Sequence, residues 1–109
     1  MKKICKLLIL SQVICYHAQQ AAEKYLKAYL VFKNEIPEKT HLIERLLSLC
    51  CKYDVSFESL KDATILTEYS VEIRYPDEFY IPDLEEARKA QKMAILVKEF
   101  VLEKIKTGL

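Results

Sequence analysis

Residues 15–32, which read CYHAQQAAEKYLKAYLVF, decide the fold predicted for this chain. They belong to a longer segment, residues 3–33, that contains neither glycine nor proline. Apolar residues recur along it in steps of three and four, which places them on one face of an α-helix. We call this face the apolar stripe, and its members are Leu7, Leu10, Ile14, Ala18, Ala21, Tyr25, Ala28 and Phe32.

The apolar stripe predicts one long helix over residues 3–33 that turns this face toward a core. Gln19, Glu23 and Lys27 would then lie on the opposite, polar face. Asn34 and Pro37 follow the segment. Both residue types favour the end of a helix, so we expect it to stop there.

Two shorter helices are predicted next. Thr40 is the predicted N-cap of the first, because its hydroxyl can accept a hydrogen bond from a backbone N–H. Apolar residues between positions 42 and 50 then form a broad face, which predicts burial between neighbouring elements. The second begins at Ser56 and continues to Val71, although its β-branched residues lower the helix propensity.

The last helix is predicted to follow an ordered loop. Residues 72–82, EIRYPDEFYIP, contain two prolines and three aromatic residues, which favour a loop over a continuing helix. Asp83, with Glu86 three positions later, is typical of a capping box. Gly108 stands where a helix ends. The predicted core face of this helix comprises Ala87, Ala90, Ala94, Val97, Val101 and Ile105.

The composition agrees with a single all-α domain. The chain has 109 residues, of which 51% are hydrophobic and 30% charged, as in an ordinary folded domain with its own core. One glycine and three prolines are too few for the frequent turns of a strand-rich fold. We therefore predict one domain over residues 1–109, an up-and-down four-helix bundle.

Charge and cysteine content argue against several classes of function. With 17 basic and 16 acidic residues the net charge is +1, so no general field attracts a nucleic-acid backbone. The four cysteines form no C-x-x-C pair, which predicts free thiols in a reducing cytoplasm and neither a metal nor a cofactor. The apolar run after Met1 is interrupted by Lys6 and is too short to cross a bilayer, so we expect a cytoplasmic protein.

Two motifs, in this order and separation, resemble the HEPN domain family. The first is YHAQQAAEKYLKAYL at residues 16–30, which is similar to the family's aromatic-H-A-Q-Q-A-A-E-K-x-L-K-A helix. The second is RYPD at residues 74–77, followed by EEA at residues 85–87. Between them, KTH at residues 39–41 falls where the family has a threonine-histidine pair at the head of a helix. The resemblance covers residues 15–100.

The resemblance implies a helical, nucleotide-associated domain that often accompanies a small nucleotidyltransferase and commonly forms dimers. Two features depart from the family's pattern. The residue after His41 is Leu42, where the family has aspartate or asparagine. The family also has a full helix before the A-Q-Q helix, whereas only residues 1–15 precede the motif here. A shortened reading frame or a partner chain in place of that helix would account for this.

HEPN relatives that cleave RNA carry an arginine followed after four to six residues by a histidine. No arginine of this chain has a histidine at that distance. Without an imidazole opposite the guanidinium there is no obvious general base for a 2′-hydroxyl. We therefore expect a chain that is not an enzyme on its own, and a ribonuclease of the toxin–antitoxin kind is the disfavoured alternative.

Candidate ligand-binding residues come first from the long helix. Gln20, Lys24 and Lys27 lie along one flank, where their amide and ammonium groups could hold phosphate oxygens. The alternative is that these lysines are solvated charges, or that they pair with Glu23 and with acidic residues of a neighbouring helix.

Further candidate ligand-binding residues lie in the KTH stretch at residues 39–41 and in the RYPD motif at residues 74–77. Arg74, in the Pro-rich loop, could be aimed at a phosphate, or could form an ion pair within that loop. Tyr75 could stack on a base, or close the end of the bundle. His41 stands at a helix start and could bond a ligand, or cap the loop before it. His17 is expected in the core.

Two hypotheses of different classes follow. In the first, the chain is a non-catalytic binding or regulatory domain for a nucleotide or nucleotide-like ligand, acts beside a nucleotidyltransferase, and uses Lys24, Lys27, Arg74, His41, Tyr75 and Gln20. In the second, it is a structural interaction module, a homodimer or part of a heterocomplex. Its contact surface would be the apolar face left by the shortened N-terminal part.

Overall fold

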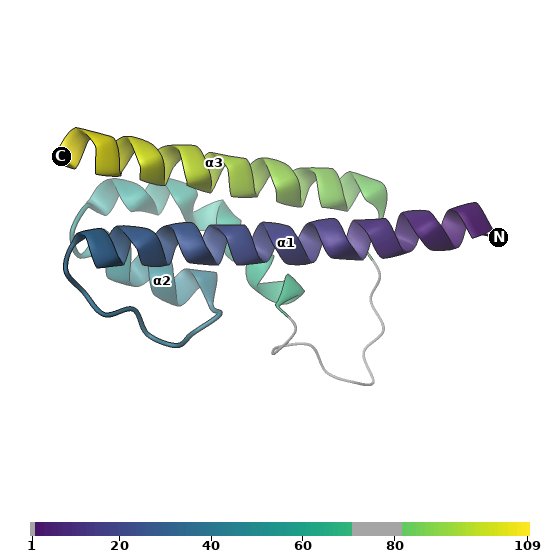
Figure 1. The fold of residues 1–109 in the computed structure, drawn as a ribbon, viewed down its shortest axis with the longest axis horizontal. Coiled ribbons are helices and arrows are strands. Elements are labelled where there is room, and N and C mark those ends of the chain that lie inside the picture. Colours follow the sequence, from purple (N-terminus) through teal and green to yellow (C-terminus); the bar gives the residue numbers. More distant parts are fainter. Residues whose placement is uncertain (1, 71–81) are drawn as a thin grey trace.

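The computed structural model describes residues 2–70 and 82–109, and of these the side chains of residues 2–5 and 8 are left aside. The prediction of an all-α fold with four helices is confirmed, and the described residues contain no strand. In chain order the elements are α1 (Lys2–Phe32), α2 (Ile43–Cys51), the 3-10 helix η1 (Val55–Tyr69) and α3 (Leu84–Gly108) (Figure 1).

The end of α1 is set by Asn34, as the sequence predicts. This residue has a left-handed backbone (φ 64°), which asparagine tolerates better than most residues. Its N–H donates to the carbonyl of Val31 (2.8 Å), and the N–H of Glu35 donates to the carbonyl of Leu30 (2.9 Å). This pair of bonds is a Schellman motif, which satisfies carbonyl groups that the last turn would leave unpaired.

Helices α1 and α3 lie side by side and run in the same direction (Figure 1). Their last turns meet where Phe32 packs against Gly108. A Cβ on Gly108 would lie 2.9 Å from Cζ of Phe32, so the only glycine of the chain permits a close approach of the two helices. Gly108 is also the last residue of α3, as predicted.

The remaining elements cover one side of this helix pair. Segment 33–42 returns along α1, so α2 begins level with the middle of α1 and runs parallel to it, while η1 runs in the opposite direction (Figure 1). The rings of Phe57 in η1 and Phe100 in α3 meet edge to face, with their centroids 4.9 Å apart. The connections from α2 to η1 and from η1 to α3 reverse the chain direction, as in the predicted up-and-down bundle, whereas the connection from α1 to α2 does not.

The buried face of α1 differs from the predicted one. Of the apolar stripe only Ala18 is fully buried, whereas Leu7, Leu10 and Ala28 are exposed. Gln19 and Glu23, predicted on the polar face, are buried. Apolar residues occupy more than half of the helix circumference, so helical spacing alone does not select the face that packs inward. The residues of α1 that are buried are Ser11, Cys15, Ala18, Gln19, Ala22, Glu23, Leu26, Tyr29 and Leu30.

Helix α2 begins later than predicted, because Thr40 is not its N-cap. The hydroxyl of Thr40 accepts a hydrogen bond from the N–H of Leu42 (3.2 Å), and the helix starts at Ile43. The N–H of Ile43 donates to the hydroxyl of Thr67 in η1 (2.9 Å), which in turn donates to the Glu44 carboxylate (2.7 Å). A neighbouring element thus caps α2.

Residues predicted as the third helix form a 3-10 helix instead. It begins after Asp54, whose carboxylate accepts from the N–H of Ser56 (3.0 Å). Its buried apolar residues follow one another in steps of three, which matches the three residues per turn of a 3-10 helix. They are Phe57, Leu60, Ala63, Leu66 and Tyr69. Val71, the predicted end, lies outside the described residues.

Helix α3 agrees with the sequence prediction. Asp83 caps it, since its carboxylate accepts from the N–H of Glu86 (2.8 Å). The Glu86 side chain accepts from the hydroxyl of Tyr69, which joins the start of α3 to the end of η1. The predicted core face is buried throughout, apart from Ile105, which is half-buried.

Candidate functional site

A buried carboxylate, Glu23 of α1, is the centre of a polar network. Its side chain is only 7% exposed. One oxygen accepts from Nε2 of Gln19 (3.0 Å) and lies 2.9 Å from Nδ1 of His41, and the other accepts from Nζ of Lys27 (3.0 Å). Gln19, Glu23 and Lys27 come from consecutive turns of one helix, and His41 comes from segment 33–42.

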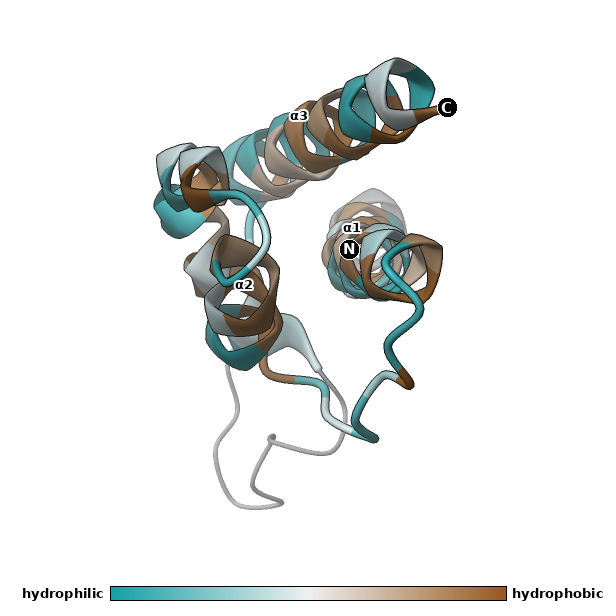
Figure 2. Ribbon diagram, turned by 90° about the vertical axis from the view of Figure 1, so that its left-hand side faces the viewer, coloured by the Kyte–Doolittle hydropathy of each residue, from teal (hydrophilic) through white to brown (hydrophobic). Residues whose placement is uncertain are grey.

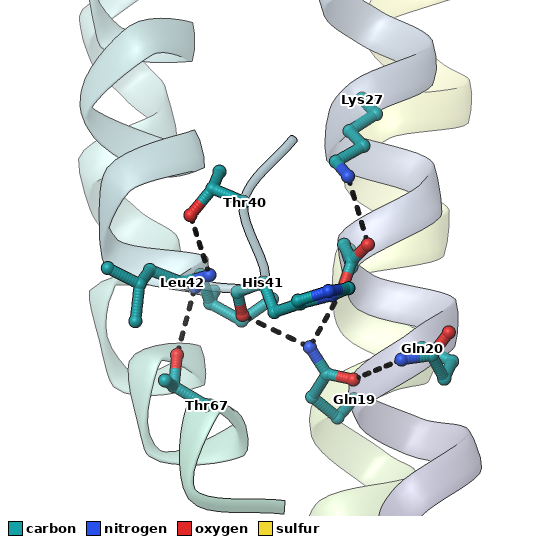
Figure 3. A network of polar contacts seen from close by, with 9 residues as sticks. Gln19, Gln20, Lys27, Thr40, His41, Leu42 and Thr67 are labelled. Carbon is teal, nitrogen blue, oxygen red and sulfur yellow. Dashed lines mark hydrogen bonds and ion pairs between the residues drawn. The ribbon is translucent and has the colours of Figure 1, made fainter. Parts of the chain in front are cut away.

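The network fastens segment 33–42 to α1. Besides its bond to Glu23, Nε2 of Gln19 donates to the backbone carbonyl of His41 (3.1 Å), and Oε1 of Gln19 accepts from Nε2 of Gln20 (2.7 Å). Figure 3 shows the His41 side chain extending from the segment before α2 toward Gln19 of α1. Lys27 lies on one side of this cluster and Gln20 lies on the other. Two separate bonds thus hold His41, one through its ring and one through its backbone.

The network keeps Glu23 ionised despite its burial. Burial alone raises the pKa of this carboxyl, since a charge is poorly solvated inside the protein. The hydrogen bonds from His41, Gln19 and Lys27, with the charge of Lys27, outweigh burial and bring the pKa below its usual value. Glu23 therefore compensates positive charge at this place, which reduces the attraction of Lys27 for an anion.

The predicted phosphate-binding residues of α1 do not converge on one open site. Lys27 pairs with Glu23, which is the alternative foreseen for it. Lys24 is exposed, and none of the described polar contacts connects it to the network. Gln20 donates to Gln19, so its amide is directed to the neighbouring side chain.

Of the other predicted ligand-binding residues, His41 joins the network, whereas two lie outside the part of the chain that the structure describes. His41 contacts Glu23 across the space between segment 33–42 and α1, and its side chain is 31% exposed. Arg74 and Tyr75 lie outside the described residues. Gln19 and Glu23 were missed as members of the site. Their spacing of four residues, continued by Lys27, is a signal for contacts along one flank of a helix.

A second candidate site is a groove between α1 and α3, on the side that faces away from α2. Its volume is about 370 Å³ and its floor is largely apolar. Four residues of the apolar stripe, Ile14, Ala18, Ala21 and Tyr25, belong to its α1 wall. The residues that line the groove are Val13, Ile14, His17, Ala18, Ala21, Tyr25, Gln91, Ala94, Ile95 and Lys98.

His17 belongs to this groove and not to the core, where it was expected. The side chain is exposed and its ring meets that of Tyr16 edge to face, with the centroids 5.6 Å apart. The prediction was wrong because Ile14, Ala18 and Ala21 of this part of α1 pack against the core, whereas His17 stays exposed. In an end-on view, hydrophobic residues are seen also on the side of α1 that faces away from α2 (Figure 2).

Large apolar side chains are exposed in and beside the groove. On α1, Leu10 is 48% and Val13 is 45% exposed. On α3, Ile95 is 48% exposed, and Leu102, two turns further along the same side, is 46% exposed. Val13 and Ile95 line the groove itself, so apolar side chains from both helices are exposed at one place, whereas single exposed apolar residues are ordinary.

The charge at the groove is basic. Among the described residues that line it, Lys98 is the charged one and none is acidic, while His17 and Tyr25 are the other ionisable side chains. The sole acidic residue of α1 is Glu23, which is buried in the network described above. Glu99, four residues after Ile95, is the nearest acidic position of α3 and does not line the groove. The chain is nearly neutral as a whole, so this excess of basic groups is local.

The cysteines offer no reactive site among the described residues. Cys15 and Cys50 are buried and Cys51 is half-buried. Burial raises the pKa of Cys50 to about 12, so it is not a thiolate at neutral pH. Across residues 2–70 and 82–109, no three histidine, cysteine or acidic side chains are grouped as a metal site would need. No helix in this part of the chain combines the length and the apolar character of a membrane span.

Comparison with known protein families places the chain in one of them. The family model described as HEPN domain matches residues 10–105, which include both the polar network and the groove. No curated protein matches the chain significantly, and neither does any solved structure.

Proposed function

This chain belongs to the HEPN domain family, and we propose from this premise that it is a non-catalytic binding domain that acts through a partner protein. The observation that carries the proposal is the open groove between α1 and α3. It leaves part of the apolar stripe accessible, and apolar surfaces at a groove of this kind mark sites of protein association. The family resemblance adds a small nucleotidyltransferase as the partner we expect.

Co-purification with a nucleotidyltransferase from the same genome tests this function. Ile95→Asp places a charge in the groove and should abolish the complex, because an unpaired charge at an apolar contact is costly. Leu96→Asp is a matched control: Leu96 is the next residue of α3, is similarly exposed at 51% and does not line the groove. Size-exclusion chromatography with light scattering measures both variants. A complex that survives Ile95→Asp would contradict the proposal.

The same measurement on the chain alone tests the homodimer that the family resemblance implies. A mass of twice 12.8 kDa is expected if the chain pairs with itself. A dimer that persists in Ile95→Asp would leave the groove available for another protein, so the two associations can be separated.

A second candidate function is binding of a nucleotide or nucleotide-like ligand beside Glu23. Its support is geometric: Glu23 offsets part of the charge of Lys27, but it also holds Lys27 and His41 in defined positions while both keep part of their surface in water, at 24% and 31% exposure. Donors that are fixed before a ligand arrives lose little freedom on binding it. Lys24 is exposed on the same helix.

Isothermal titration with ATP and with GTP tests the ligand hypothesis. We expect heat from at least one of them, reduced by roughly tenfold or more in affinity by Lys27→Ala or by Arg74→Ala, since a charge-assisted hydrogen bond contributes about 1.5–3 kcal/mol. Lys92→Ala, an exposed lysine of α3, is the control. No heat from either nucleotide with the folded protein would overturn this function and leave partner binding untouched.

A further inference from the structure

The groove between α1 and α3 has features that specify its occupant. We propose that it binds an amphipathic α-helix of a partner protein, with acidic side chains flanking the apolar face of that helix. This inference rests on the proposed partner-binding function, and it adds the chemical class of the bound segment.

The shape of the groove fits a helix. Its walls are two parallel helices, and a third helix can pack its ridge of side chains into the channel between them. Ala18, Ala21 and Ala94 line the floor, where small side chains allow close approach. Stripe residues Ile14 and Ala21 are seven residues apart, which is the repeat of helices that pack side by side.

The charges at the edges of the groove favour an acidic partner. His17 lines the α1 edge, and Lys24 follows it by seven residues on the same side. Lys98 lines the α3 edge; of the exposed residues beside that edge, Arg88 precedes Ile95 by seven residues and Glu99 follows it by four, so Lys98 carries the charge that faces the groove. These positions are exposed, and none of the lining residues is acidic. Carboxylates of a bound helix would therefore meet the positive charge of Lys98 at the α3 edge and, two turns beyond His17, that of Lys24 on α1.

Two other occupants fit these observations less well. A second copy of the chain would bring the same basic edges face to face, because its own groove carries no acidic lining residue. An anionic membrane surface would satisfy the charges, but helices that lie on membranes present a convex apolar face, whereas this surface is a channel between two helices.

Two synthetic peptides test the inference by fluorescence anisotropy with the full chain. Both have three heptads with leucine at a and d; one carries glutamate at e and g, the other lysine. We expect the glutamate peptide to bind at least about tenfold more tightly in low salt, with the difference reduced in high salt. Lys98→Glu should lower the preference, Ile95→Asp should abolish binding, and Leu96→Asp should leave it unchanged.

The outcomes that overturn the inference are distinct. If both peptides bind with equal affinity, the groove does not select acidic side chains and the inference fails. Loss of a homodimer in Ile95→Asp, measured by light scattering, assigns the groove to a second copy. Binding to phosphatidylserine vesicles that Ile95→Asp abolishes, without peptide binding, assigns it to a membrane. If neither peptide binds while the nucleotidyltransferase complex still depends on Ile95, the acidic-helix inference fails and the proposed function stands.

Discussion

Glu23 shows how one side chain connects parts of the chain that are distant in sequence. Its carboxylate contacts Gln19 and Lys27 along α1, and His41, which lies 18 residues later. A buried carboxylate is tolerated only where hydrogen bonds and opposite charge replace its hydration. The network supplies both, so Glu23 fixes the path of segment 33–42 at the entrance to α2.

Glu23→Ala should therefore destabilise the fold. We expect a loss of about 2–3 kcal/mol in the free energy of unfolding, since hydrogen bonds to a charged group are removed and Gln19 loses a partner. Urea denaturation measures it. Glu99→Ala, at an exposed position of α3, is the control and should change the free energy by less than about 0.5 kcal/mol. Equal stability of the two variants would contradict the role assigned to Glu23.

Among the elements, α2 depends most on a neighbour. It has nine residues and no side-chain cap of its own, because its N-cap position is Leu42. A helix this short is marginal in isolation. The hydroxyl of Thr67 in η1 provides the missing acceptor for the N–H of Ile43.

Thr67→Val should remove this tertiary cap while keeping the shape of the side chain. The buried N–H of Ile43 would lose its partner, so we expect a loss of about 1–2 kcal/mol in the free energy of unfolding. Thr64→Val, one turn earlier in η1 and half-buried, is the matched control. Thermal unfolding followed by circular dichroism measures both, and a Thr67→Val protein as stable as the control would rule the cap out.

Helix α1 has two apolar faces with different roles. Leu26 lies on the buried face and is fully inaccessible, whereas Leu10 lies on the apolar stripe and is half exposed. Leu26→Ala should cost about 2–5 kcal/mol, because it removes buried methyl groups and leaves a cavity. Leu10→Ala should cost less than about 0.5 kcal/mol in the isolated chain. Urea denaturation compares the two, and similar losses would mean that the stripe is buried in solution.

For the molecule as a whole, an ion pair joins the turn between α2 and η1 to the last turns of α3. Lys104 donates to the Asp54 carboxylate at 2.8 Å. This bond, with those from the Ser56 hydroxyl and N–H, lowers the pKa of Asp54 to about 2. A carboxyl group whose pKa is lower in the folded state stabilises the fold above its unfolded pKa of about 3.9.

The contribution of Asp54 should therefore be complete above about pH 4 and lost as the pH falls toward 2. We expect Asp54→Asn to be less stable than the wild type at pH 7, and the difference to narrow between pH 4 and pH 2. Urea denaturation across that range measures it, with Asp62→Asn, an exposed aspartate of η1, as control. A difference that stays constant down to pH 2 would contradict this account.

Local patterns in the chain were enough to predict the four helices, the all-α class, the stop at Asn34 and the cap at Asp83, because spacing and capping act within a few residues. The family motif in residues 16–30 was also readable in the same way. Even the period of three in η1 was present between Phe57 and Tyr69, although β-branched residues around it obscured the helix type.

The buried face of α1 could not be read from the same patterns, because it depends on where the other elements pack. Apolar residues surround so much of α1 that the choice between Leu26 and the apolar stripe is made by α2, η1 and α3. Contacts such as His41 with Glu23 and Thr67 with Ile43 join residues separated by 18 and 24 positions. Such pairs exist only after the helices have assembled, so folding in three dimensions created both the polar network and the open groove.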